Sequence, residues 1–235
     1  MDLPDLSWQF VYGRVAWALV LASLVAVAWP AGWHLPRRTL AAILGASAVL
    51  MALPGAASPA WHLGLAFQYP SGLLLGFCLV RLHAHWSAAP AAPLMPVATA
   101  ALLAVVGGFL YLDAAGVLAR GAYYAGFGPD AAPLAALLLA FVCALAATRG
   151  QWRPQACAML AAVLLFSLAR LPTGNLWDAV LDPLLWVWAL AVLCAAALRR
   201  LQAGRRHAPH VAGGSAHGLP ARHAAGTEPF LPIKE

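Results

Sequence analysis

The chain has 235 residues, of which 63% are hydrophobic and only 9% are charged. A soluble domain carries about a quarter charged residues, so this composition excludes an ordinary water-soluble fold and indicates an integral membrane protein. The net charge is +6, but the arginines stand as pairs and singles between apolar runs rather than together on one surface. That spacing argues against a nucleic-acid partner and favours membrane lipids, with other membrane proteins as further partners.

Proline and glycine clusters divide the first 202 residues into apolar runs. A helix needs roughly 20 apolar residues to cross about 30 Å of hydrocarbon, and most of the runs are close to that length. We therefore predict an all-α bundle of about seven transmembrane helices within residues 1–202. Six spans with a re-entrant third segment are the alternative. The predicted spans are approximately 10–29, 39–56, 62–81, 96–118, 131–148, 155–171 and 176–198.

The orientation follows from the arginines, because short cytoplasmic loops retain basic residues. An outside N-terminus leaves Arg14, Arg120 and Arg170 on the outer side. The inner side then receives Arg37, Arg38, Arg81, Arg149, Arg153, Arg199, Arg200, Arg205 and Arg206. We predict an outside N-terminus and a cytoplasmic C-terminus in a bacterial-type inner membrane.

Two terminal segments need separate treatment. Ala26-Val27-Ala28 resembles a signal-peptidase site, but the apolar run before it lacks a basic start, and cleavage would export most of the arginine-rich loops. We expect no cleaved signal peptide. Residues 203–235 are rich in Arg, His, Gly, Pro and Ala, so they bury too little apolar surface to fold, and we predict a disordered, basic cytoplasmic tail.

The last span is informative because of its length. From Pro183 to Leu198 it has about 24 Å of helix, too little to cross the hydrocarbon, so the helix is expected to start near Leu176. Thr173 or Asn175 would then cap it. Asp178 and Asp182 would lie one turn apart on one face, and Pro183 would open or kink the helix between its ends.

Several polar residues are expected at the depth of Asp182 under the outer surface. Ionisable groups within spans usually face the bundle interior and pair with one another. The sequence predicts a polar pocket that holds either a ligand or structural ion pairs. Its members are Arg14, Gln68, Tyr69, Asp113, Arg120, Arg170, Asp178 and Asp182, with His62 as a further candidate.

Signals for catalysis or cofactors are weak. Aspartates four residues apart occur in many first helical turns, and Ser71 has no nucleophile motif around it. All four cysteines fall in the inner halves of predicted spans without a CxxC pair, and no span places histidines at haem-ligand depth. We assign no catalytic residue, no metal site and no cofactor.

Three functions stay open at this point. A non-enzymatic accessory or scaffold protein is the leading interpretation, because no catalytic motif accompanies the charges. The alternative is a permease or a protein that binds a small solute or lipid in the charged pocket. The third is an intramembrane enzyme that acts on a lipid-linked substrate.

Overall fold

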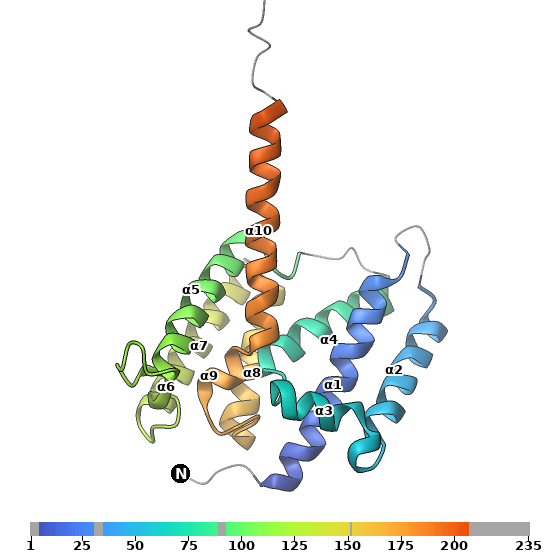
Figure 1. The fold of residues 1–235 in the computed structure, drawn as a ribbon, viewed down its shortest axis with the longest axis horizontal. Coiled ribbons are helices and arrows are strands. Elements are labelled where there is room, and N and C mark those ends of the chain that lie inside the picture. The colour runs from blue at the N-terminus through green and yellow to red at the C-terminus, as the bar shows by residue number, and fades with distance from the viewer. Residues whose placement is uncertain (1–4, 31–34, 89–92, 151, 207–235) are drawn as a thin grey trace, which may run out of the picture.

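The structure is a computed structural model, and it describes residues 5–30, 35–88, 93–150 and 152–206. Every regular element within these ranges is a helix, which confirms the all-α prediction (Figure 1). Four helices are long and apolar enough to cross a membrane: α1 (Leu6–Ala28), α5 (Val97–Ala114), α7 (Ala131–Thr148) and the Pro183–Ala203 part of α10 (Pro183–Arg206).

Three shorter helices pack among these four. They are α2 (Arg37–Ala52), α4 (Gly72–Ser87) and α8 (Arg153–Ala169), with 16, 16 and 17 residues. The remaining elements are the 3₁₀ turn η1 (Gly55–Ala57), α3 (Pro59–Phe67), α6 (Ala122–Ala125) and α9 (Leu176–Val180). In Figure 1, α3, α6 and α9 lie at the end where α1 begins, which we call the lower end. The upper end is the opposite one.

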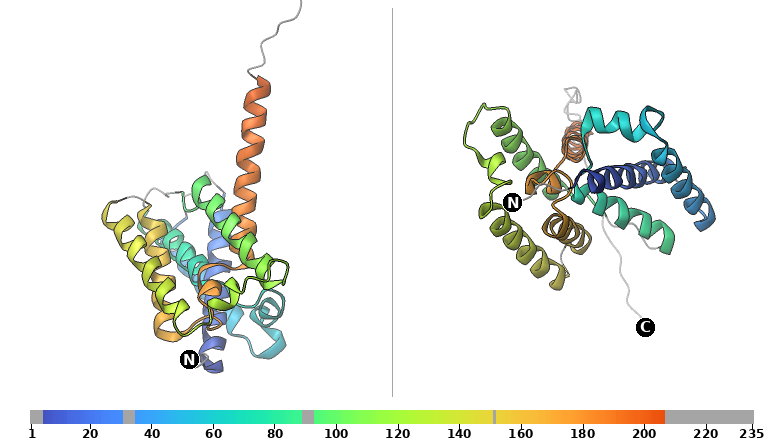
Figure 2. Two further views of the ribbon diagram at one scale, coloured as in Figure 1. Left: turned by 90° about the vertical axis from the view of Figure 1, so that its left-hand side faces the viewer. Right: turned by 90° about the horizontal axis from the view of Figure 1, so that it is seen from below.

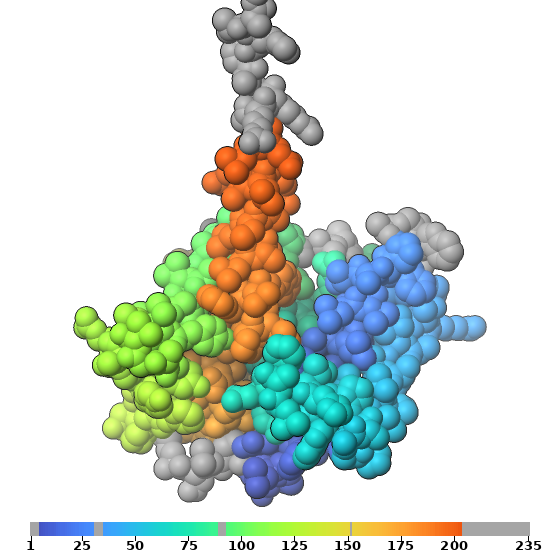
Figure 3. All heavy atoms as spheres, in the orientation of Figure 1, coloured from blue at the N-terminus to red at the C-terminus, as the bar shows by residue number. Residues whose placement is uncertain are grey.

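Viewed from the lower end, the bundle has two flanks (Figure 2, right). Helices α1, α2 and α3 form one flank, α5, α6 and α7 form the other, and α9 with the start of α10 lies between them. The C-terminal turns of α10 extend past every other helix at the upper end (Figures 1 and 3).

Small residues bring α4 and α8 together at the centre of the bundle. A Cβ atom on Gly76 would lie 2.8 Å from the Cβ atom of Ala158, and one on Gly72 would lie 2.9 Å from the Cα atom of Ala162. Glycine and alanine one turn apart on both helices therefore let the two backbones approach closely, as is common between helices in membranes.

The predicted span 62–81 is two helices rather than one. Helix α3 ends at Phe67 because Gln68 has a positive φ of 59°, and α4 begins at Gly72. Pro70 lies in the connection, and the Ser71 side chain caps α4 by accepting a hydrogen bond from the Leu74 amide. The segment between the two helices therefore brings Gln68 and Tyr69 to the lower end.

The predicted span 176–198 is also divided. Of the two caps that the sequence offers, Thr173 and Asn175, it is Asn175 that caps a helix starting at Leu176, with its side-chain oxygen accepting from the Trp177 amide at 2.9 Å. That helix ends at Val180, Leu181 is extended, and α10 starts at Pro183. Asp178 and Asp182 therefore do not share one face of a continuous helix.

The predicted tail begins inside α10, which continues to Arg206. Residues 207–235 lie outside the described residues.

Candidate functional site

Asp113, near the end of α5, holds a loop at the lower end. Its carboxylate is buried and accepts hydrogen bonds from the backbone amides of Arg120 at 2.6 Å, Gly121 at 3.1 Å and Tyr123 at 2.9 Å. Arg120 takes part through its main chain, and its side chain is exposed. Asp113 thus orders the segment that leads into α6.

Tyr123 of α6 connects this loop to Asp178 of α9. The tyrosine hydroxyl donates to one carboxylate oxygen of Asp178 at 3.0 Å, and the Thr173 hydroxyl donates to the other at 2.5 Å. Burial raises the pKa of Tyr123, so the phenol stays protonated and remains a donor at neutral pH.

Asn175 locks the same two loops together. Its side-chain amide donates to the Tyr123 carbonyl at 3.2 Å, while the Leu176 amide donates to the Gly126 carbonyl at 3.0 Å. A Cβ atom on Gly126 would collide with the Asn175 side chain, so this close approach requires glycine. Residues 120–128 and 173–178 therefore form one hydrogen-bonded unit.

Asp182 joins the starts of two long helices. Its side chain is only 5% exposed, and its carboxylate accepts from the Ser71 amide at 2.6 Å and from the Leu185 amide at 2.8 Å. Ser71 precedes α4 and Leu185 lies in the first turn of α10, so both helix N-termini point at one negative charge. Helix dipoles stabilise an anion in that position.

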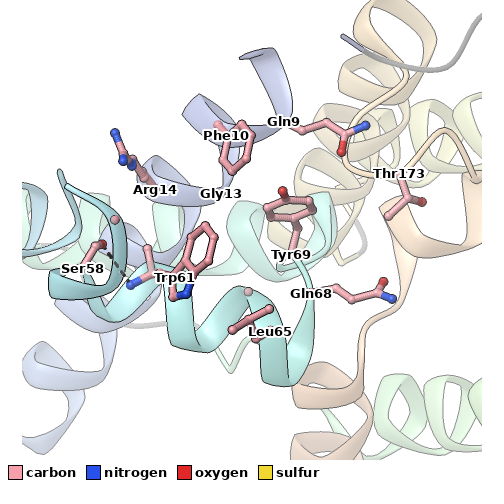
Figure 4. Close-up of a pocket in the computed structure, with 13 residues that line it drawn as sticks. Gln9, Phe10, Gly13, Arg14, Ser58, Trp61, Leu65, Gln68, Tyr69 and Thr173 are labelled. Carbon is pink, nitrogen blue, oxygen red and sulfur yellow. Dashed lines mark hydrogen bonds between the residues drawn. The ribbon is translucent and has the colours of Figure 1, made fainter. Parts of the chain in front are cut away.

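A cavity of about 570 Å³ opens at the lower end between α1, α3 and the loop that contains Thr173. Figure 4 shows the rings of Phe10, Trp61 and Tyr69 around its middle. Arg14 lies at one side, and the polar ends of Gln9, Gln68 and Thr173 lie at the other. The cavity thus combines aromatic walls with polar groups at its margins.

The eight predicted pocket residues separate into groups. Arg14, Gln68 and Tyr69 line the cavity. Asp113, Arg120 and Asp178 belong to the hydrogen-bonded loops, and Asp182 belongs to the junction of α4 and α10. Arg170 ends α8 with a positive φ of 56°, and its guanidinium lies 4.8 Å from the centre of the Phe166 ring.

The hydrogen bonds that the structure gives the three aspartates come from backbone amides and from hydroxyl groups. The donors that sequence reasoning missed are Tyr123 and the Ser71 amide. Tyr12 was missed too; its hydroxyl donates to the Pro70 carbonyl at 2.7 Å and fixes the α3–α4 connection on α1. The two residues of each of these hydrogen bonds are 10 to 111 positions apart in sequence, so no local sequence pattern predicts the pairing.

Few side chains at the lower end are placed to act as a catalytic group or a metal ligand. The Ser71 side chain is fully buried and its hydroxyl oxygen caps α4. His62 contacts the Ala56 carbonyl at 2.9 Å. Among the described residues, no three His, Cys, Asp or Glu side chains gather as metal ligands.

No family model matches the chain, and no curated protein and no solved structure is significantly similar to it.

Proposed function

We propose that this chain is a non-enzymatic accessory protein of a bacterial-type inner membrane, which binds a small amphipathic ligand in the cavity at the lower end. The ligand is a lipid or solute with an apolar part and an anionic or hydrogen-bonding head. The lower end faces outward in this proposal, and the C-terminus is cytoplasmic.

The arrangement of the helices supports seven crossings. Helices α1, α2, α4, α5, α7, α8 and α10 run alternately up and down, and the connecting elements η1, α3, α6 and α9 lie at the lower end (Figure 1). The arginines of the upper end, such as Arg37, Arg38 and Arg199, then fall on the inner side, where basic residues are retained.

The cavity is the observation that carries the binding role. Its 570 Å³ falls within the roughly 300–1,000 Å³ of small-molecule sites. Tryptophan, tyrosine and phenylalanine rings provide apolar contact area with few rotatable bonds, and the arginine and the amides at the margin suit a polar head. An amphipathic molecule matches both parts.

The hydrogen bonds of the three carboxylates support a non-catalytic role. Asp113 and Asp182 each hold backbone amides of other segments, and Asp178 holds two hydroxyl groups. A general acid or base needs a reacting group within hydrogen-bond reach, whereas these carboxylates already use their oxygens to join loops and helices.

The binding role can be tested by extracting and identifying what co-purifies with the full chain. A Cβ atom on Gly13 would lie 2.6 Å from the Tyr69 ring, so Gly13→Ala is expected to push that ring into the cavity and reduce the bound ligand. Trp61→Ala, which removes an aromatic wall, is expected to do the same. Mass spectrometry of organic extracts from equal amounts of protein measures the effect.

The matched control is Gly108→Ala in α5, where an added Cβ meets no atom within 4 Å. It should retain the ligand at the wild-type level. Equal amounts of the same molecules in wild-type, Gly13→Ala and Trp61→Ala protein would contradict the binding role.

A scaffold role is the second candidate, favoured by the projecting end of α10. Leu198 and Leu201, in the C-terminal part of α10, are 58% and 65% exposed. A photo-crosslinking amino acid at Leu201 should capture one defined protein in native membranes, whereas the same group at Leu137, on the outer face of α7, should capture lipid. Identical crosslinking patterns at both positions would contradict the scaffold role.

A further inference from the structure

A second cavity lies toward the upper end, between α1, α4 and α10. It has a volume of about 390 Å³ and a largely apolar lining that includes Val20, Leu24 and Val27 of α1, Phe77 of α4 and Trp188 of α10. Arg81 of α4 adds a positive charge to this lining. We call this cavity the Arg81 groove, and it is separate from the cavity at the lower end.

The Arg81 guanidinium lacks an acceptor at its inner nitrogen. The Nε atom is buried and has no hydrogen-bond partner, and the same is true of the Nε2 atom of His85, one turn further along α4. A buried donor left unpaired costs about 1–3 kcal/mol, and more when it is charged. No described residue pairs with Arg81 Nε, and the Arg81 side chain as a whole is only half-buried where it lines the groove.

The arginines at the upper end also lack a nearby negative charge among the described residues. The aspartates of the described chain lie away from the upper end: Asp5 precedes α1, Asp113 is near the end of α5, Asp130 precedes α7, Asp178 lies in α9 and Asp182 precedes α10. Arg37 adds a second guanidinium near the end of α4, where its Nε atom donates to the Trp86 carbonyl at 2.7 Å. No described carboxylate is therefore placed to neutralise Arg81.

The lining of the groove indicates which occupant it takes. It is mostly apolar, with Val20, Leu24 and Phe77 among its side chains, and Arg81 is the charged residue among the described ones that line it. A phospholipid matches both parts, because an acyl chain covers apolar surface and a phosphate accepts charge-assisted hydrogen bonds from a guanidinium.

We propose that the Arg81 groove binds an anionic phospholipid from the leaflet at the upper end. One acyl chain lies along the α1 and α10 side chains, and a phosphate oxygen accepts a hydrogen bond from the Arg81 guanidinium. Charge-assisted hydrogen bonds of this kind are among the stronger ones, so the headgroup charge determines which lipid is retained.

Native mass spectrometry of the purified full chain tests the proposal. Phosphatidylglycerol and phosphatidylcholine with identical acyl chains are added in equal amounts, and wild-type protein should retain the anionic lipid about tenfold more strongly. Arg81→Gln should abolish this preference. Val27→Trp, which fills the groove, should reduce retention of both lipids.

The control is Arg38→Gln, which removes an exposed charge from α2 at the same end and should leave the preference intact. A preference that survives Arg81→Gln, or equal retention of both lipids by wild-type protein, would overturn the proposal. If Arg81→Gln protein aggregates, the Val27→Trp variant and the wild-type preference decide. Inorganic phosphate that raises the melting temperature as much as phosphatidylglycerol would overturn the assignment of the acyl chain.

Discussion

At the scale of single residues, the lower end is held by carboxylates that act as caps for other segments. Asp182 is the clearest case, because its two oxygens accept from amides that lie in different helices, Ser71 before α4 and Leu185 in α10. A buried amide without an acceptor is strongly unfavourable. The Asp182 carboxylate is therefore needed as the acceptor for these two amides.

Replacing Asp182 by alanine is expected to destabilise the protein by about 2–4 kcal/mol, because two buried amides lose their acceptor and α10 loses its cap. Asp182→Asn keeps one acceptor oxygen and should lie between the alanine variant and the wild type. Reversible unfolding in mixed micelles measures both. The control is Asp130→Ala at the start of α7, where the side chain makes no capping hydrogen bond and the expected change is close to zero.

Tyr123 supplies a second test at this scale. Tyr123→Phe removes the hydroxyl that donates to Asp178 while keeping the ring, and it is expected to lower stability by about 1–2 kcal/mol. Hydrogen exchange should show residues 120–128 opening more often than in the wild type. Unchanged exchange in this segment would mean that the hydrogen bonds of Asn175 and of the Leu176 amide hold the two loops together without the tyrosine hydroxyl.

At the scale of elements, the contact of α4 with α8 depends on residues without bulk. Gly72 and Gly76 face Ala162 and Ala158, and the distances leave no room for an additional methyl group. This contact fixes the position of Ser71 and therefore the junction at Asp182.

Gly76→Ala is expected to destabilise the protein by about 1–2 kcal/mol, because overpacking outweighs the gain in helix propensity. Gly108→Ala in α5 has open space around it and should be neutral or slightly stabilising. Thermal unfolding of the two variants in detergent compares them directly. Adding Ala158→Gly to Gly76→Ala should restore part of the lost stability, and failure of this rescue would place the strain elsewhere.

Sequence reasoning found the helices whose apolar runs are long and the cap at Asn175, because these signals are local. The length argument joins α9 to α10, whereas the structure starts α10 at Pro183, and the Asp182-Pro183 pair has the residue types of a helix start. The loop unit around Asp113, Tyr123 and Asp178 depends on tertiary contacts. The sequence therefore predicts the two aspartates as site residues but not the groups that donate hydrogen bonds to them.

At the scale of the whole molecule, the orientation of the chain in the membrane decides which end of the bundle faces outward and which faces the cytoplasm. We expect a C-terminal green fluorescent protein fusion to fluoresce and a C-terminal alkaline phosphatase fusion to be inactive, because the proposed topology puts the upper end, with its arginines, in the cytoplasm. A phosphatase inserted after Val117, between α5 and α6, should be active. The opposite pattern would exchange the two faces and contradict the proposed topology.

If the proposed seven crossings hold, the three short helices have a consequence for the surrounding bilayer. With 16, 16 and 17 residues, α2, α4 and α8 are only about 24–26 Å long, less than the roughly 30 Å of an average hydrocarbon layer. A membrane-spanning helix that is shorter than the hydrocarbon layer is accommodated by local thinning of the bilayer. The α2 flank is therefore expected to thin the membrane locally and to favour regions of short acyl chains.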